Sequence, residues 1–119
     1  MKELRFTETR RDEVLILSVC GEVDMITAPS FRQKLADIMA AGETKVILDL
    51  RETSYIASSG LGAISQAAKD IRVKGGELCL ARVHYLSREV MKFFGLMPIV
   101  RIYDNIEEAV KILQKPPQA

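Results

Sequence analysis

The sequence contains few residues that could build a metal site, a disulfide or a catalytic base. Its 119 residues include two cysteines and one histidine. Cys20 and Cys79 each lie in an apolar run, with no second cysteine or histidine at metal-ligand spacing, so buried, reduced thiols are expected. His84 is the sole imidazole that could act as a general base. We therefore predict neither a metal nor another cofactor.

An excess of charge of one sign is missing as well. The 17 basic residues nearly balance the 16 acidic ones, so no basic field is available to hold nucleic acid or an anionic membrane. No run approaches the roughly 20 apolar residues of a membrane span. The first residues, MKELRFTETRRDE, contain no apolar stretch typical of a signal peptide. We expect a cytoplasmic domain without direct nucleic-acid or membrane partners.

What the sequence does contain is enough apolar residues, 48%, for the core of one domain. Strand-like runs alternate with helix-like periodicity. The predicted strands are 3–9, 14–21, 45–50, 77–83 and 99–103. The predicted helices are 27–42, 87–95, 104–115 and one that begins around Ser58 or Ser59 and ends at the KGG of residues 74–76. This order predicts an α/β fold with a mixed, mostly parallel sheet of about five strands and about four helices. The domain is expected to span residues 1–115, with a short tail at 116–119.

Several residues have specific predicted roles within these elements. The nearly continuous apolar run at 45–50 is typical of a strand that is buried on both faces. In the short helix at 87–95, Val90, Phe93 and Phe94 are available to pack inward. Asp104 is expected to cap the last helix.

The stretch YIASSGLG, residues 55–62, joins the central strand to the second helix. In parallel sheets, ligands and modifications gather where the chain leaves the carboxyl end of a strand. Ser58 is a candidate N-cap, and that role alone would explain a serine. Ser58 is equally a candidate phosphorylation site, because a helix N-terminus favours an anion. Ser59 is less well placed, since it lies one residue further into the helix and is expected to turn sideways. Gly60 and Gly62 would then leave room for another protein to approach the backbone.

Two other interpretations of this stretch, a hydrolase nucleophile and a phosphate-binding nucleotide loop, lack residues that they require. IASSG has no glycine two places before a serine, as a nucleophile elbow needs, and SSGLG has no lysine of a nucleotide-binding loop. A non-enzymatic binding module is therefore expected. A small hydrolase using Ser58 and a lipid- or nucleotide-binding module are the alternatives from other classes.

A second cluster, GEVDMITA at residues 21–28, lies at the preceding strand-to-helix junction. Asp24 is either a turn or capping residue or a functional one. If the two strands are neighbours, Asp24 and Ser58 lie on the same rim of the sheet. A carboxylate there would repel a phosphoserine, so that one modification could alter a binding face.

Three segments, in this order, resemble the STAS domain family, and within it the stand-alone anti-sigma factor antagonists of bacteria. GEVDMITAPSFRQKL is similar to that family's glycine–acid–x–Asp segment, and VILDLRETSYIASSGLGAI to its signature strand, turn and helix. FFGLMPIVRIYDNIEEAV is similar to its closing pattern. The resemblance covers nearly the whole chain and implies a single STAS domain.

The resemblance also implies partner switching. In that family the unmodified antagonist binds an anti-sigma factor, a serine kinase with a histidine-kinase-like ATP-binding fold, and so frees a sigma factor. The kinase phosphorylates the first hydroxyl residue of a D-[ST]-[ST]-G motif, which abolishes binding, and a metal-dependent serine phosphatase restores it. Ser58 matches the phosphoacceptor. The implied partner-binding residues are Asp24, Ser58, Ser59, Gly60, Leu61 and Gly62.

One position departs from the family motif, because the acid that normally precedes the acceptor is Ala57 here. The change removes a negative charge and a hydrogen-bond acceptor that could orient the hydroxyl or contact the kinase. It is compatible with a different kinase, with a slower switch, or with a member that binds without being switched. The alternative function is a STAS module in a stressosome-like or other signalling assembly with a non-sigma output.

Overall fold

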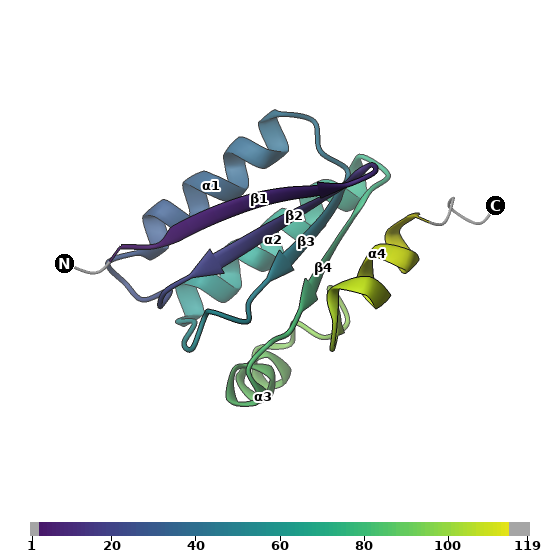
Figure 1. The fold of residues 1–119 in the computed structure, drawn as a ribbon. Coiled ribbons are helices and arrows are strands. Elements are labelled where there is room, and N and C mark those ends of the chain that lie inside the picture. Colours follow the sequence, from purple (N-terminus) through teal and green to yellow (C-terminus); the bar gives the residue numbers. More distant parts are fainter. Residues whose placement is uncertain (1–2, 115–119) are drawn as a thin grey trace.

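The computed structural model describes residues 3–114, which form five strands and four helices (Figure 1). The elements are β1 (Arg5–Arg11), β2 (Val14–Cys20), α1 (Ala28–Ala40), β3 (Lys45–Asp49), α2 (Ser58–Val73), β4 (Glu77–Ala81), α3 (Tyr85–Phe94), β5 (Arg101–Tyr103) and α4 (Ile106–Gln114). The strands lie in the sheet in sequence order; β1 pairs antiparallel with β2, and the remaining pairs are parallel. The predicted α/β fold is confirmed. The tail predicted at 116–119 lies outside the described residues.

Both faces of the sheet are covered by helices. Helix α1 connects β2 to β3, and α2 connects β3 to β4, so both connections move in the same direction along the sheet. Because such crossovers are right-handed, both helices lie on the same face. Helix α4 packs on the opposite face, against β2 to β5 (Figure 1). Helix α3 does not cover the sheet; it lies at the carboxyl end of β4 and contacts α2 (Figure 1).

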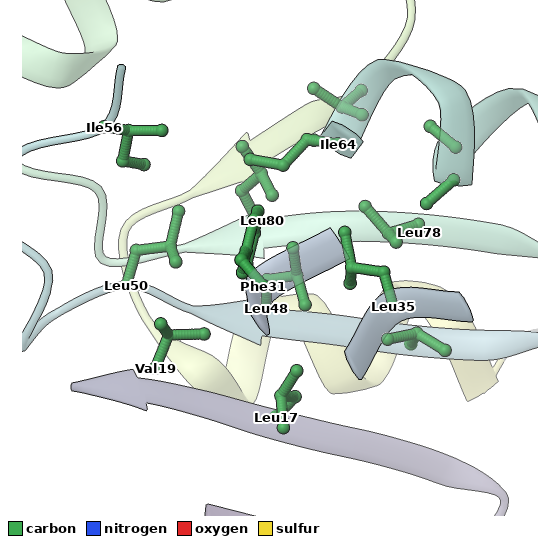
Figure 2. Close-up of a cluster of buried hydrophobic side chains, with 14 of the residues drawn as sticks. Leu17, Val19, Phe31, Leu35, Leu48, Leu50, Ile56, Ile64, Leu78 and Leu80 are labelled. Atoms are coloured by element: carbon green, nitrogen blue, oxygen red, sulfur yellow. The ribbon is translucent and has the colours of Figure 1, made fainter. Parts of the chain in front are cut away.

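The central strand β3 is buried on both faces, as its apolar run predicted. Val46 and Leu48 join the larger core cluster, which contains Phe31 of α1, while Ile47 joins the smaller cluster beneath α4, with Val110. Figure 2 shows Leu48 and Phe31 close together in the larger cluster. Alternate residues of a strand point to opposite faces, so a strand covered by helices on both sides must be apolar throughout.

Helix α3 is rotated relative to the prediction. Its buried residues are Ser87 and Met91, whereas Val90, Phe93 and Phe94, which were expected to pack inward, are 50%, 94% and 43% exposed. A short helix at the end of a sheet meets the domain along one narrow stripe. Only one of the two apolar stripes of α3 can therefore be buried.

The capping residue of α4 lies one position later than predicted. The Asn105 side chain, and not that of Asp104, caps the helix, because Asn105 Oδ1 accepts a hydrogen bond from the Glu108 amide at 2.8 Å. Asp104 instead accepts from Arg88 Nη2 at 3.2 Å. Both side chains can cap a helix, so the backbone conformation decided between them.

The two cysteines are both free. Cys79 is buried in the cluster beneath α4, while Cys20 is only half-buried. Burial raises the pKa of the Cys79 thiol far above its ordinary value. The thiol therefore stays protonated and unreactive.

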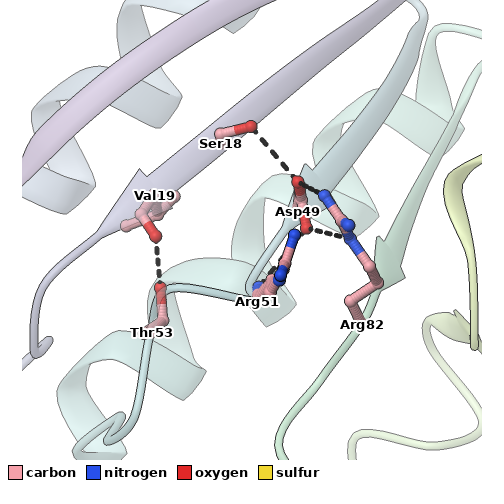
Figure 3. A network of polar contacts seen from close by, with 6 residues as sticks. All are labelled: Ser18, Val19, Asp49, Arg51, Thr53 and Arg82. Carbon is pink, nitrogen blue, oxygen red and sulfur yellow. Dashed lines mark hydrogen bonds and ion pairs between the residues drawn. The ribbon is translucent and has the colours of Figure 1, made fainter.

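A polar network closes the carboxyl end of the sheet on the α4 side. Asp49, which is 6% exposed, accepts from Arg82 Nε at 3.1 Å and from Arg82 Nη2 at 2.6 Å. Ser18 Oγ donates to the same carboxylate at 3.3 Å (Figure 3). This bidentate ion pair raises the pKa of Arg82 and joins the ends of β2, β3 and β4.

We expect Arg82→Met to lower the free energy of unfolding by about 1–2 kcal/mol, because Asp49 would keep a buried charge without its main partner. The loss stays below that of a fully buried pair, since the Arg82 side chain is 35% exposed. Urea denaturation measures it. Arg11→Met is the matched control, because its partner Glu107 is exposed, and no measurable change is expected there. Equal losses in the two variants would contradict the prediction.

Candidate functional site

The site begins where two chain segments continue side by side beyond the ends of β2 and β3. The Val23 amide donates to the Tyr55 carbonyl at 2.9 Å, and the Ala57 amide donates to the Val23 carbonyl at 2.7 Å. These bonds extend the parallel pairing of β2 with β3. Asp24 and Ser58 therefore follow directly on paired residues at the same rim of the sheet, as the sequence predicted for neighbouring strands.

Ser58 is the first residue of α2 and not its N-cap, so the predicted capping role is wrong. The N-cap is Ala57, whose backbone is extended at φ −72° and ψ 165° and whose side chain makes no capping bond. The Ala57 carbonyl accepts from the amides of Gly60, at 2.9 Å, and Leu61, at 3.0 Å. The Ser58 side chain is exposed. Its hydroxyl is accessible to another protein.

The two adjacent hydroxyls face different surfaces. Ser58 lines a groove of about 550 Å³ between the start of α2 and α3. Ser59, which is also exposed, lines a smaller depression of about 250 Å³ between α1 and α2, together with Arg32. A partner that approaches along one groove therefore meets only one of the two serines.

The glycines and the leucine of this helix start have three different environments. A Cβ on Gly60 would lie 2.6 Å from Val23 Cγ1 and 2.8 Å from Ile56 Cγ2. Gly60 therefore lets α2 pack against the neighbouring loop, and does not leave the backbone open as predicted. Leu61 is 1% exposed and belongs to the core. Gly62 is half-buried, and apart from the adjoining backbone of its own helix no atom lies within 4 Å of the point that a Cβ would occupy there. Of the two glycines, Gly62 therefore offers the open backbone that was expected.

Asp24 has the turn role that was one of its two predicted roles. Its Oδ1 accepts from the amides of Ile26, at 2.9 Å, and Thr27, at 3.0 Å. The carboxylate thus holds the turn that leads into α1. The tip of this turn carries two apolar side chains that no sequence motif marked, Met25 and Ile26, which are 85% and 78% exposed.

The groove beside Ser58 is lined mainly by apolar residues, and the sequence did not predict that they form one surface. Among them are Tyr55, Leu86, Val90, Phe93 and Phe94. One signal was available in the sequence: the segment 85–94 contains more apolar residues than one buried stripe of a short helix can use. Such an excess predicts an exposed apolar surface.

The structure also describes the residues that a catalytic base, a metal site or a membrane span would require. His84 Nδ1 accepts from the Leu86 amide at 3.3 Å, so the imidazole caps α3. Within residues 3–114, no group of three or more His, Cys, Asp and Glu side chains could hold a metal ion. The part of the chain that the structure describes also contains no helix that is long and apolar enough to cross a membrane.

Comparisons with known proteins match nearly the whole chain. A family model described as the STAS domain matches residues 6–109. The anti-sigma F factor antagonist of Paenibacillus polymyxa is 31% identical over 102 residues, which cover 85% of this chain and 87% of that protein.

Solved structures share the fold. An anti-sigma factor antagonist from Mycobacterium paratuberculosis superposes with a TM-score of 0.86 at 21% identity, covering 94% of this chain and 95% of that one. The Bacillus cell fate determinant SpoIIAA in its phosphorylated form superposes with a TM-score of 0.71 at 23% identity, covering 92% and 100%. At these identities the likeness establishes the fold alone.

We expect Gly60→Ala to lower the free energy of unfolding by about 1–3 kcal/mol, because the new methyl group collides with Val23 and Ile56. Gly62→Ala is the matched control in the same helix. It meets open space and is expected to be neutral or stabilising by up to about 1 kcal/mol. Thermal and urea unfolding of both variants test this. A stable Gly60→Ala protein would show that the contact with the neighbouring loop is dispensable.

Proposed function

This chain belongs to the STAS domain family, and we propose that it is an anti-sigma factor antagonist that binds an anti-sigma factor kinase and so releases a sigma factor. The observation that carries the proposal is the exposed Ser58 at the first residue of α2, beside a groove of uncharged residues. The relative from Paenibacillus polymyxa, named for the same activity, matches over 87% of its length. An action on sigma factors places the protein in the cytoplasm.

The binding surface is the rim around Asp24 and Ser58. Exposed side chains there, Ser58 and Ser59 on α2 and Met25 and Ile26 on the neighbouring turn, can touch a partner directly. Buried Gly60 and Leu61 act from beneath, by fixing the position of the helix start. None of these residues has to catalyse a reaction, so the role is regulatory and not enzymatic.

Phosphorylation of Ser58 is the switch in this proposal. A phosphoryl group adds about −1.5 to −2 charges to a rim that carries the Asp24 carboxylate. No residue that lines the adjoining groove is charged, so none of them can neutralise the addition. The rim becomes negative, and a partner that fits the neutral form must desolvate this charge. The anti-sigma factor is the kinase, and a metal-dependent serine phosphatase restores the neutral form. SpoIIAA, which shares the fold, exists in a phosphorylated form.

We expect phosphate on Ser58 after incubation with ATP and the anti-sigma-type serine kinases of the source organism. Intact-mass and peptide mass spectrometry locate it. Ser58→Ala should abolish the modification, and Ser59→Ala is the matched control that should retain it. Calorimetric titration should show Ser58→Asp binding at least about tenfold more weakly than Ser58→Ala, from the desolvation of a charge. Phosphate confined to Ser59, or tight binding by Ser58→Asp, would contradict the proposal.

Ala57→Asp tests the departure from the family motif. A carboxylate at the N-cap can accept from the free amides of the first turn, so the variant should be more stable by about 0.5–2 kcal/mol. The same carboxylate lies beside the acceptor hydroxyl, and we expect faster phosphorylation of Ser58. Ala57→Asn is the control, since it supplies the cap without the charge. A rate that rises equally in both variants would assign the effect to the cap alone.

A further inference from the structure

The groove between the start of α2 and α3 has two walls of different origin. One wall is the helix start, with Ser58 and the exposed Tyr55; the other is the outer face of α3. Its volume of about 550 Å³ is that of a pocket for a drug-sized ligand, so it has room for side chains of a partner. Because Ser58 is part of the wall, a protein that contacts this hydroxyl from the α3 side must also cover the groove.

Helix α3 presents a continuous apolar stripe to this groove. Leu86, Val90 and Phe93 recur at helical spacing, and each is at least 50% exposed. A second, buried stripe, Ser87 and Met91, already anchors the helix to the domain. The outer stripe is therefore not needed to hold α3 in place, and large exposed apolar surfaces of this kind mark interaction sites.

The charges around the groove indicate what it accepts. On α3, Lys92 pairs with Glu89 at 3.2 Å, and Arg88 pairs with Asp104 at 3.2 Å. The polar groups of the lining are hydroxyls, such as those of Ser58 and Tyr55, and no lining residue is charged. A charged occupant would lose its water without gaining a counter-charge, whereas an apolar one would match the surface.

We propose that this groove receives an apolar face of an amphipathic helix of the anti-sigma factor, with Phe93 as its main anchor. The inference rests on the proposed function and identifies how the partner is held. A helix fits because the side chains of α3 at i, i+4 and i+7 form a ridge, and this ridge can pack into a groove on the surface of a second helix. The continuity of the groove with Ser58 selects the partner that reads this serine, in preference to a second copy of this chain.

This arrangement also explains how one phosphoryl group releases the partner. On Ser58 the phosphate lies at the wall of the groove, and none of the side chains that line the groove is cationic. Docking of an apolar helix would remove water from about −1.5 to −2 charges. The partner is then released because desolvating the phosphate costs free energy, and no change in the fold is needed.

Binding of the full-length chain to the purified anti-sigma-type kinases of the source organism, measured by calorimetry, tests the anchor. Phe93→Ala should weaken binding roughly 10- to 100-fold, as expected for a buried aromatic hot spot. Val73→Ala is the matched control, since Val73 is 88% exposed at the far end of α2, and its affinity should stay within about twofold of the wild type. Both positions are exposed, so neither variant is expected to unfold.

The outcomes separate this inference from the proposed function. If Ser58→Asp weakens binding but Phe93→Ala does not, the groove is not the docking site and the function stands. If none of the kinases binds the wild type, the proposed function fails and this inference fails with it. Sedimentation of the chain alone tests whether a second copy of the chain occupies the groove instead. A dimer that Phe93→Ala dissociates would assign the groove to a second copy and overturn the inference.

Photo-crosslinking identifies the chemistry of the occupant. With Phe93→p-benzoylphenylalanine, the crosslinked kinase peptide should carry apolar residues at i, i+3 or i+4, and i+7. The same substitution at Val73 should give no crosslink. A peptide without this spacing, or equal crosslinking from both positions, would overturn the proposal of an amphipathic helix.

Discussion

The hydrogen bonds of Val23 to Tyr55 and Ala57 determine the geometry of the site. They continue the parallel pairing of β2 and β3 into loop residues and keep the backbone extended as far as Ala57. Helix α2 can then begin only at Ser58. Gly60 completes the arrangement, because only a residue without Cβ allows this close approach to Val23 and Ile56. The exposed Ser58 is thus held in place by backbone hydrogen bonds and close packing, which suits a residue that a second protein would recognise.

Helix α3 is the element in which folding and binding place different demands on one segment. Met91 on its inner stripe is fully buried, whereas Phe93 on its outer stripe is 94% exposed. A helix that had only to fold would carry polar residues on that outer stripe. Exposing Phe93 and Val90 to water is unfavourable, and a partner that covers them would remove this cost. Both residues line the same groove as Ser58, the proposed phosphorylation site.

The carboxyl end of the sheet therefore has two unlike sides. On the α4 side, Asp49 and Arg82 form a closed ion pair that joins strand ends and leaves little unsatisfied charge. On the α2 and α3 side, the residues that line the groove beside Ser58 are uncharged and mostly apolar. Charge is neutralised by an ion pair on the first side and absent from the groove lining on the second. A single phosphoryl group would consequently dominate the electrostatics of the second side.

Much of the architecture could be predicted from the sequence, because strand and helix periodicity follow from which side chains must be buried. The run at 45–50 required a strand covered on both faces, and the strand-to-helix order required a mostly parallel sheet. What the tertiary structure alone decided were choices between equivalent local options. Asn105 caps α4 in place of Asp104, and α3 buries Met91 in place of Phe93. Gly60 serves close packing, and Ser58 is the first helical residue. The residues that compete for each role have similar intrinsic helix or capping preferences. Contacts between segments that are distant in the sequence, such as that of Gly60 with Val23, therefore decided the outcome.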